Sequence, residues 1–421
     1  MNKLLNDLLT VAIVGCGSRG QNTYTSILLN MPDKVRIVAA ADPDPDKLRG
    51  MQEKCGLTPE QCYASAEEMF LQPRLADLLV IATPDECHYV HARAALNLDY
   101  HLLLEKPIAP RAEECQELAE LAEQRGRHVA VCHVLRYTPF YQKIKQLLED
   151  GVAGEVVTVQ GVERVAYWHQ AHSYVRGNWR REDESSCMLL AKCCHDMDII
   201  LWLLGDKCVK TSSFGSLKHF RADQAPEGAA LRCLDCKVKG CLFNAADYYL
   251  GRYRQAGNSW PQNVVAFDPT EEKLLMALRE GPYGRCVYHS DNDVVDHQVV
   301  MMEMASGATV TYTMTAFSSD EGRYLRIMGT RGEIIADMRS NTIQVMPFGG
   351  KEEMIDVRTL ASDFSGHGGG DARLVREYVE FLRGECPMTR TMTSISRSVE
   401  SHLVALAAEE SRKKGGVPIT L

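Results

Sequence analysis

The chain has 421 residues, of which 45% are hydrophobic and 24% are charged, a composition typical of globular domains that excludes fibrous and disordered classes. Its 47 basic and 56 acidic residues give a formal net charge of −9, which argues against a nucleic-acid partner. No apolar run approaches the roughly 18 residues that cross a bilayer, so we expect an unprocessed cytoplasmic protein with no membrane contact.

The first 135 residues alternate apolar strands with helices. The run TVAIV at 10–14 ends in glycines and is followed by a helix-compatible stretch through Leu29. Further strands are expected at 35–42, 77–83, 100–105 and 128–136, with a helix at about 111–124. This alternation predicts a doubly wound parallel sheet covered on both faces, which is a Rossmann domain over residues 1–135.

Residues 136–421 follow a different pattern. A long strand is expected at 156–168, a helix at 188–205, and further strands at 293–304, 308–317, 324–330, 332–338 and 341–348. Turn residues between most of these runs favour an antiparallel sheet. A glycine-rich hinge at 366–371 precedes the C-terminal helix. Residues 218–285 fit neither pattern and are predicted to be an insertion in this second, α/β domain.

A glycine-rich turn follows the first strand. Gly15, Gly17 and Gly20 form G-x-G-x-x-G and open a helix. In this context the glycines permit a tight turn, close approach of a pyrophosphate and close helix–strand packing, which predicts dinucleotide binding. Asp42 ends the second strand, where a carboxylate binds ribose hydroxyls and repels a 2′-phosphate, so NAD is favoured over NADP. Arg19 instead favours NADP, because its guanidinium is able to bind the 2′-phosphate.

These motifs together resemble the Gfo/Idh/MocA oxidoreductases. GCGSRG, IATPDECHYVHARAAL, LLLEKPIA and RYTP stand in the order and spacing of that family, and the Glu105-Lys106-Pro107 motif is the most specific of them. The resemblance covers essentially the whole chain. It implies a Rossmann domain followed by an α/β domain with a large open, mainly antiparallel sheet, a homo-oligomer, and NAD(P)-dependent redox chemistry on sugars or inositols. The candidate cofactor contacts are Gly15, Gly17, Ser18, Arg19, Gly20, Asp42, Thr83, Pro84, His88, Glu105 and Lys106.

Two lysines and a histidine are the candidate catalytic residues. Lys106 lies at the carboxyl edge of the parallel sheet, where ligands bind, and the resemblance makes it a proton acceptor beside the nicotinamide. Typical family members carry Asp, His and Asp on a later helix, where this chain has Ala191, His195 and Asp198. We expect His195 to act as an acid/base or as a ligand of a substrate hydroxyl. Lys192 departs from the family pattern, and we expect it to favour an anionic substrate.

A segment rich in aromatic and polar residues, YWHQAHSYVRGNWRREDESS, occupies residues 167–186. Aromatic faces pack against sugar C–H groups while polar side chains bind hydroxyls, so this mixture predicts a sugar site; a polar loop anchored by its tryptophans is the alternative. Arg176 and Arg180 are able to clamp a carboxylate, whereas Arg136 is explained equally well by a salt bridge. The candidate substrate contacts are Arg136, Tyr137, Trp168, His172, Tyr174, Arg176, Trp179, Arg180 and Asp198.

The insertion contains three closely spaced cysteines. Cys233, Cys236 and Cys241 form C-x2-C-x4-C, which suggests a structural zinc site completed by His219, Cys286 or His289. An iron–sulfur cluster and simple packing of reduced thiols are the alternatives. The remaining cysteines are expected to be reduced and mostly buried, because 15 cysteines cannot all pair within one chain.

The function expected from these features is NAD-dependent hydride transfer between nicotinamide and a secondary hydroxyl of a sugar or glycoside. Two alternatives remain open. The resemblance includes a branch that cleaves glycosidic bonds by transient oxidation and elimination, and a sugar- or NAD-sensing protein without turnover is the third reading.

Overall fold

The computed structural model describes residues 8–421 and confirms both predicted sheets. The first sheet is entirely parallel, with strand order β3-β2-β1-β4-β5-β6. Its central strands are buried on both faces, as expected of a doubly wound sheet. The strands are β1 (Leu9–Val14), β2 (Val35–Ala41), β3 (Cys62–Tyr63), β4 (Leu78–Ile81), β5 (His101–Leu104) and β6 (Val129–Val131).

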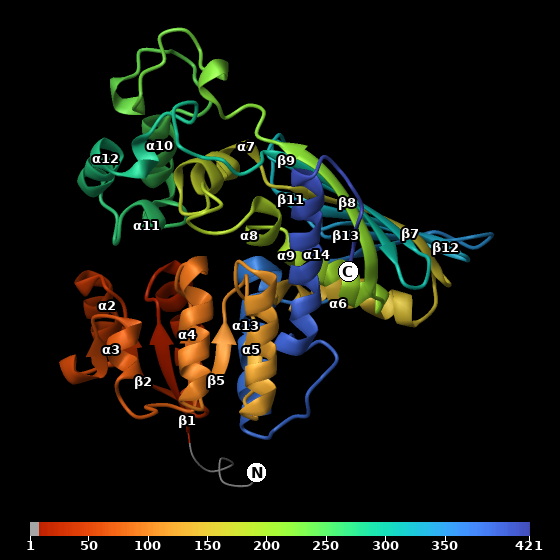
Figure 1. Ribbon diagram of the computed structural model, residues 1–421, viewed down its shortest axis with the longest axis horizontal. Coiled ribbons are helices and arrows are strands. Elements are labelled where there is room, and N and C mark those ends of the chain that lie inside the picture. Colours follow the sequence, from red (N-terminus) through yellow and green to blue (C-terminus); the bar gives the residue numbers. More distant parts are fainter. Residues whose placement is uncertain (1–7) are drawn as a thin grey trace.

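Helices cover both faces of this sheet (Figure 1). They are η1 (Ser18–Thr25), α1 (Ser26–Leu29), α2 (Pro45–Cys55), α3 (Ala66–Phe70), α4 (Asp85–Asn97) and α5 (Ala112–Gln124). Local sequence sets their ends: α2 begins with an Asp44 cap and Pro45, and it ends at Gly56 with φ 67°. The late helix α13 (Ser365–Leu382) also packs here, because Leu374 and Val375 belong to the core that lies against β1.

The second sheet has nine strands in the order β14-β13-β12-β11-β7-β10-β9-β8-β15. All neighbours are antiparallel except β7 and β10. The strands are β7 (Val156–Arg164), β8 (Cys208–Ser216), β9 (His297–Met304), β10 (Thr309–Thr315), β11 (Gly322–Gly329), β12 (Gly332–Asp337), β13 (Thr342–Pro347), β14 (Glu353–Asp356) and β15 (Ile419–Thr420).

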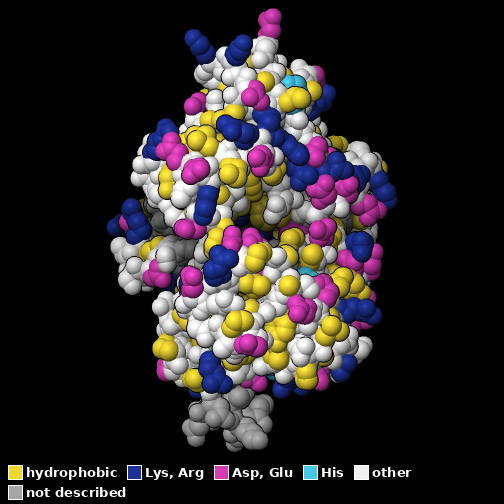
Figure 2. Space-filling view, turned by 90° about the vertical axis from the view of Figure 1, so that its left-hand side faces the viewer, with side chains coloured by type: hydrophobic (Ala, Val, Ile, Leu, Met, Phe, Trp, Pro, Cys, Tyr) yellow, Lys and Arg dark blue, Asp and Glu magenta, His cyan; other side chains and the backbone are white. Residues whose placement is uncertain are grey.

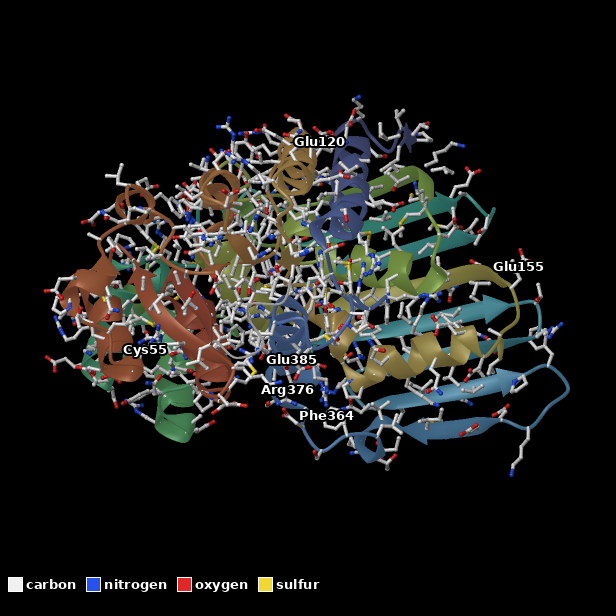
Figure 3. All side chains as sticks on the ribbon, turned by 90° about the horizontal axis from the view of Figure 1, so that it is seen from below. Cys55, Glu120, Glu155, Phe364, Arg376 and Glu385 are labelled. Atoms are coloured by element: carbon white, nitrogen blue, oxygen red, sulfur yellow. The ribbon has the colours of Figure 1, made fainter. Side chains whose placement is uncertain are left out.

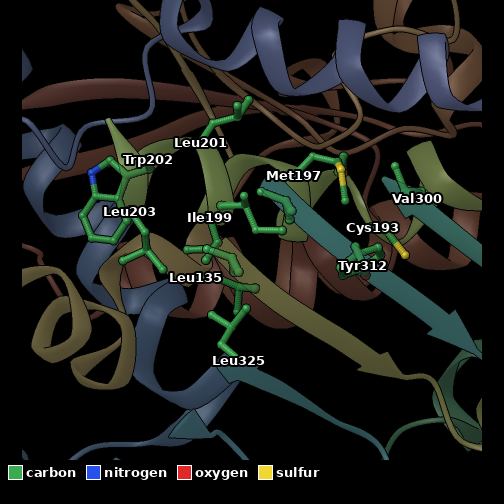
Figure 4. Packing of buried hydrophobic residues seen from close by; sticks show 14 of the residues in the cluster. Leu135, Cys193, Met197, Ile199, Leu201, Trp202, Leu203, Val300, Tyr312 and Leu325 are labelled. Atoms are coloured by element: carbon green, nitrogen blue, oxygen red, sulfur yellow. The ribbon is translucent and has the colours of Figure 1, made fainter. Parts of the chain in front are cut away.

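Helices cover one face of this sheet and form the largest core. They are α6 (Pro139–Glu149), α8 (Met188–Ala191), α9 (Cys194–Leu204) and α14 (Ile395–Lys413). Figure 3 shows α6 lying along the strands, and Figure 4 shows Met197 and Ile199 of α9 above Tyr312 and Leu325 of the sheet. This packing fixes the position of the segment that carries His195.

The insertion folds as a small helical unit with its own core. It contains α10 (Ala245–Ala256), α11 (Gln262–Val265) and α12 (Glu271–Glu280), which pack around Tyr249, Leu274 and Leu278. In Figure 1 it stands above the Rossmann domain, beside the short helix α7 (Tyr167–His169). The insertion therefore lies next to the segment predicted to bind substrate.

Three expected elements differ from the structure. The strand predicted at 156–168 ends at Arg164, and Tyr167–His169 form the short helix α7. The strand predicted at 128–136 ends at Val131, and a helical turn, η3 (Val134–Tyr137), follows it. The helix predicted at 188–205 is broken between Ala191 and Cys194, with φ −104° at Lys192. Because of this break, Ala191 offers its carbonyl oxygen to Lys106. Among residues 8–421, no helix is both long and apolar enough to cross a membrane.

Candidate active site

The glycine turn after β1 has the shape that a pyrophosphate needs. Gly15 has φ +88°, and a Cβ on it would lie 2.5 Å from the Ala82 oxygen. A Cβ on Gly20 would lie 1.9 Å from the Gly15 oxygen, whereas a Cβ on Gly17 would meet nothing within 4 Å. Gly15 and Gly20 therefore close the turn, and Gly17 leaves open space at the helix start, where anions bind.

Asp42 supports this turn from the end of β2. One carboxylate oxygen accepts a hydrogen bond from the Cys16 amide at 2.7 Å, and the other accepts one from the Asp44 amide at 2.9 Å. Lys47 approaches to 3.6 Å. Because a carboxylate has about four acceptor positions, Asp42 retains capacity for ribose hydroxyls.

Arg19 binds two carboxylates of the protein itself. Its Nε donates to Glu105 at 2.5 Å and its Nη2 donates to Asp371 at 2.8 Å, while Tyr24 also donates to Glu105. Burial raises the pKa of Glu105, but Arg19 and Lys106 outweigh burial and hold the pKa below its usual value. The guanidinium is thus committed to two carboxylates, which removes the argument that Arg19 favours NADP.

Lys106 projects from the loop after β5 toward the second domain. Its ammonium donates to the Ala191 oxygen at 2.9 Å and lies 5.8 Å from the Trp179 ring centroid. The Trp179 indole nitrogen in turn donates to Asp85, which also accepts from Ser185 and Ser186.

Three residues predicted as cofactor contacts fix the loops beside Lys106. Pro84 caps α4, and the ring nitrogens of His88 lie 2.9 Å from the Thr83 oxygen and 2.6 Å from the Pro107 oxygen. His88 therefore joins the loop after β4 to the loop that carries Lys106.

Four histidines form a file beside Lys106. Ring centroids are separated by 5.4 Å for His402–His133, 5.6 Å for His133–His195 and 6.1 Å for His195–His367. Both nitrogens of His133 and the Nδ1 of His195 are buried without a hydrogen-bond partner among residues 8–421, although the His133 Nε2 lies 4.0 Å from an Asp198 oxygen. Burial, followed by the charge of Lys106, holds the pKa of His195 well below its usual value. His195 is therefore a neutral imidazole.

The outer end of this file is set by the glycine hinge. Residues Gly366 to Gly369 have φ values of 47°, 45°, 68° and 85°, so His367 lies in the left-handed region that glycine tolerates and histidine rarely adopts. His367 contacts Asp371 at 2.9 Å, and Asp371 binds Arg19. The hinge thus connects the histidine file to the cofactor turn.

Lys192 lies in a buried cluster of charges. Its ammonium is 3.3 Å from a Glu163 oxygen, and Arg323 contacts both Glu163 and Asp196. Burial raises the pKa of Glu163, whereas Arg323 and Lys192 oppose that rise. Two cations and two carboxylates balance in this cluster, so Lys192 does not present an unopposed positive charge.

Aromatic rings continue outward from Lys106 along the predicted substrate segment. Trp179 lies 6.0 Å from Tyr174, Tyr174 lies 6.0 Å from His169, and His169 stacks on Trp168 at 5.5 Å. The insertion adds Trp260, 5.0 Å from His169. His172 lies behind this row, where its Nδ1 contacts the Tyr249 hydroxyl at 2.8 Å and burial lowers its pKa to about 3.

Several predicted substrate contacts instead bind other protein groups. Arg136 donates twice to Asp198, at 2.7 Å and 2.5 Å, so the salt-bridge alternative holds for this buried pair. Arg176 is buried and donates to the oxygens of Arg285 and Phe243. Arg180 pairs with Asp291 and Glu184, and Tyr137 is buried in the Rossmann core. In the structure, protein groups therefore occupy both arginines of the predicted carboxylate clamp, which stays a prediction.

The predicted zinc site is not supported. No group of three or more His, Cys, Asp or Glu within residues 8–421 is arranged to hold a metal ion. Cys233, Cys236, Cys241 and Cys286 line one small pocket as free thiols, and the Cys233 Sγ lies 3.4 Å from an Arg176 nitrogen. Packing of reduced thiols beneath the insertion is the reading that agrees with these contacts.

Comparison with known proteins identifies the family. Residues 9–133 match the family model described as "Oxidoreductase family, NAD-binding Rossmann fold", and residues 145–421 match "Oxidoreductase family, C-terminal alpha/beta domain". The chain belongs to the Gfo/Idh/MocA oxidoreductase family. The matched N-terminal domain is an NAD-binding domain, in agreement with the glycine turn.

Individual members of the family match over most or part of the chain. The putative oxidoreductase YteT of Bacillus subtilis is 24% identical over 90% of this chain and 90% of its own length. An inositol 2-dehydrogenase of Corynebacterium glutamicum is 26% identical over 50% of this chain and 60% of its own. The solved inositol dehydrogenase homologue from Azotobacter vinelandii, complexed with NAD+, has a TM-score of 0.71 at 17% identity and covers 100% of this chain and 99% of its own. This last match supports the fold.

The Gfo/Idh/MocA motifs do not reveal every residue at the site. Reasoning from the sequence missed Asp85, Glu163, Trp260 and His367. The run of glycines around His367 was a signal, since consecutive glycines mark a backbone that other residues rarely adopt. Trp260 gave no signal, because only the folded insertion brings it to His169.

Proposed function

We propose that this protein is an NAD-dependent dehydrogenase that transfers hydride between nicotinamide and a secondary hydroxyl of a sugar or glycoside. One observation carries this proposal: the Lys106 ammonium, after a strand of the Rossmann sheet, binds the Ala191 oxygen four residues before His195, whose pKa its charge helps to lower. When bound, NAD supplies the hydride acceptor or donor.

Lys106 and His195 handle the proton of the substrate hydroxyl. As the carbon loses hydride to become a carbonyl, the hydroxyl must lose its proton. The neutral imidazole of His195 accepts this proton, and the Lys106 ammonium donates a hydrogen bond that stabilises the negative charge developing on oxygen. In the reverse direction the same two groups return the proton to the carbonyl oxygen.

A carbohydrate substrate is supported by the site and by the relatives. Trp168, His169 and Trp179 are partly exposed rings along one side of the site, and the buried Tyr174 lies between His169 and Trp179. The matched relatives include an inositol 2-dehydrogenase, and a solved WlbA dehydrogenase from Chromobactrium violaceum in complex with NADH and UDP-GlcNAcA has a TM-score of 0.70.

A substrate panel tests the proposal. Sugars, uronates, inositols and aryl glycosides are incubated with protein and NAD+, with NADH followed by absorbance and products by mass spectrometry. We expect NADH together with a product two hydrogens lighter. Aglycone release without NADH would identify the redox-neutral glycosidase instead, and no product from any compound would contradict both enzymatic readings.

A further inference from the structure

The insertion extends the aromatic row beyond the catalytic groups. Trp260 lies 5.7 Å from Trp168 and 5.0 Å from His169, and Tyr248 stacks on Trp168 at 6.2 Å. Trp168, Tyr248 and Trp260 therefore form one cluster, which we call the outer aromatic cluster. Its rings come from two segments that lie about 80 or more residues apart in the chain. The tertiary fold, and not a local turn, therefore brings them together.

The rings of this cluster are accessible. Trp260 is 38% exposed, a large fraction for a tryptophan, and Trp168 and Tyr248 are partly exposed. The Tyr248 hydroxyl itself is buried and has no hydrogen-bond partner among residues 8–421. The partly exposed rings match what a sugar requires, since one sugar face is apolar and packs on aromatic faces.

Arg252 adds a positive charge at this cluster. Its guanidinium lies 5.4 Å from the Trp168 centroid and 5.5 Å from the Tyr248 centroid. Within the described part of the chain no carboxylate forms an ion pair with it, in contrast to Arg176, Arg180 and Arg323, whose donors are engaged. The exposed guanidinium is therefore available to an anionic ligand, and the acidic group beside the cluster, Glu321, is bound to His169 at 3.1 Å instead.

The insertion also reaches the Rossmann domain. A Cβ on Gly50 of α2 would lie 3.2 Å from the Phe267 ring, so Phe267, seven residues after Trp260, touches the helix that follows Asp42. Figure 2 shows the surface hollowed between the insertion above and the Rossmann domain below. Phe267 thus brings the insertion, which carries Tyr248 and Trp260, against the cofactor domain.

We propose that Trp168, Tyr248 and Trp260 form a subsite for a second sugar ring, and that Arg252 binds a carboxylate on that ring. The substrate class is then an acidic disaccharide or longer glycoside rather than a free monosaccharide. This inference rests on the proposed function for the inner site, where Lys106 and His195 act. The outer cluster supplies affinity for the neighbouring sugar and takes no part in proton transfer.

Binding to the protein saturated with NAD+ tests the subsite separately from turnover. The probes are uronates of gluco, galacto and manno configuration, each paired with its homodisaccharide, and the neutral hexoses with theirs, measured by titration calorimetry. We expect at least one acidic disaccharide to bind about tenfold more tightly than its monosaccharide. Trp260→Ala should abolish this gain, and Trp260→Phe, which keeps an aromatic face, should restore much of it.

Two further variants complete the test. Arg252→Gln should remove the preference for acidic over neutral disaccharides, and Phe348→Ala, which removes an exposed ring remote from the site, should change neither quantity. If no disaccharide binds more tightly than its monosaccharide, or if the gain persists in Trp260→Ala, the subsite is overturned. If a Trp260-dependent gain is found but no sugar yields NADH, the subsite stands and the proposed dehydrogenase activity fails.

Discussion

The two ends of the site differ in how completely their polar groups are satisfied. At the cofactor end, Arg19, Glu105 and Asp371 bind one another, and Asp42 accepts two backbone hydrogen bonds. At the substrate end, His133, His195 and Tyr248 have buried polar atoms without partners among the described residues. Unpaired buried polar groups cost free energy, so the histidine pair at the substrate end is less completely satisfied than the cofactor end.

The largest expected effect is at Lys106, on the boundary between the two ends. Lys106→Ala removes the ammonium near the reacting hydroxyl but leaves the glycine turn intact, so we expect kcat to fall by about 10²- to 10⁴-fold while NAD binding is retained. Steady-state kinetics and NAD titration by tryptophan fluorescence measure the two quantities. Turnover within about threefold of the parent would show that Lys106 is not a catalytic residue.

A second variant, at Asp42, tests how the cofactor end selects NAD over NADP. Asp42→Ala removes an acceptor for the ribose hydroxyls and the charge that repels a 2′-phosphate. We therefore expect NAD to bind about tenfold more weakly and the ratio of the NADP to the NAD dissociation constant to fall. Titrating both cofactors gives the ratio. An unchanged ratio would mean that another residue selects the cofactor, and since Arg19 is committed to Glu105 and Asp371, that residue would lie elsewhere.

Local geometry explains why the cofactor end was predictable from sequence and the substrate end was not. Gly15, Gly17 and Gly20 perform their roles within one turn, so their spacing alone encodes the site. Trp260 and His367 reach the site only through the fold of the insertion and of the left-handed hinge. The partners of Arg176 and Arg180 are unpredictable for the same reason. The carbonyl and carboxylate groups that accept hydrogen bonds from these arginines come from distant parts of the sequence.

Replacing His133 tests whether the unpaired nitrogens at the substrate end lower the free energy of unfolding. His133→Phe removes two unpartnered buried nitrogens from a ring that packs between two other histidines, so we expect the free energy of unfolding to rise by about 1 kcal/mol near neutral pH. Denaturant unfolding measures this change. A gain in stability accompanied by weaker turnover would show that the open nitrogens are kept for function; a loss of stability would show that His133 is a satisfied core residue.

The same variant should change the pH dependence of stability. Burial, followed by the charges of Arg136 and Lys106, holds the pKa of His133 well below its usual value, so the unfolded chain binds a proton that the folded chain does not. The parent therefore loses stability as the pH falls below about 6.5, and His133→Phe should reduce that loss by up to about 1.4 kcal/mol per pH unit. Unfolding of both proteins at about pH 7 and about pH 5 checks the sign.

Lys192 is expected to have the smallest effect, although it is the clearest departure from the family pattern. An unopposed cation there would favour anionic substrates, but the ammonium lies 3.3 Å from Glu163 and belongs to a balanced cluster with Arg323 and Asp196. Lys192→Met keeps the side-chain length and leaves Arg323 to hold Glu163, so we expect kcat/KM to change by less than about fivefold. The change should be equal for acidic and neutral sugars, measured as kcat/KM for each class. If kcat/KM falls only for acidic sugars, Lys192 does set a preference for anionic substrates. If kcat/KM falls strongly for both classes, Lys192 takes part in proton transfer together with Lys106 and His195.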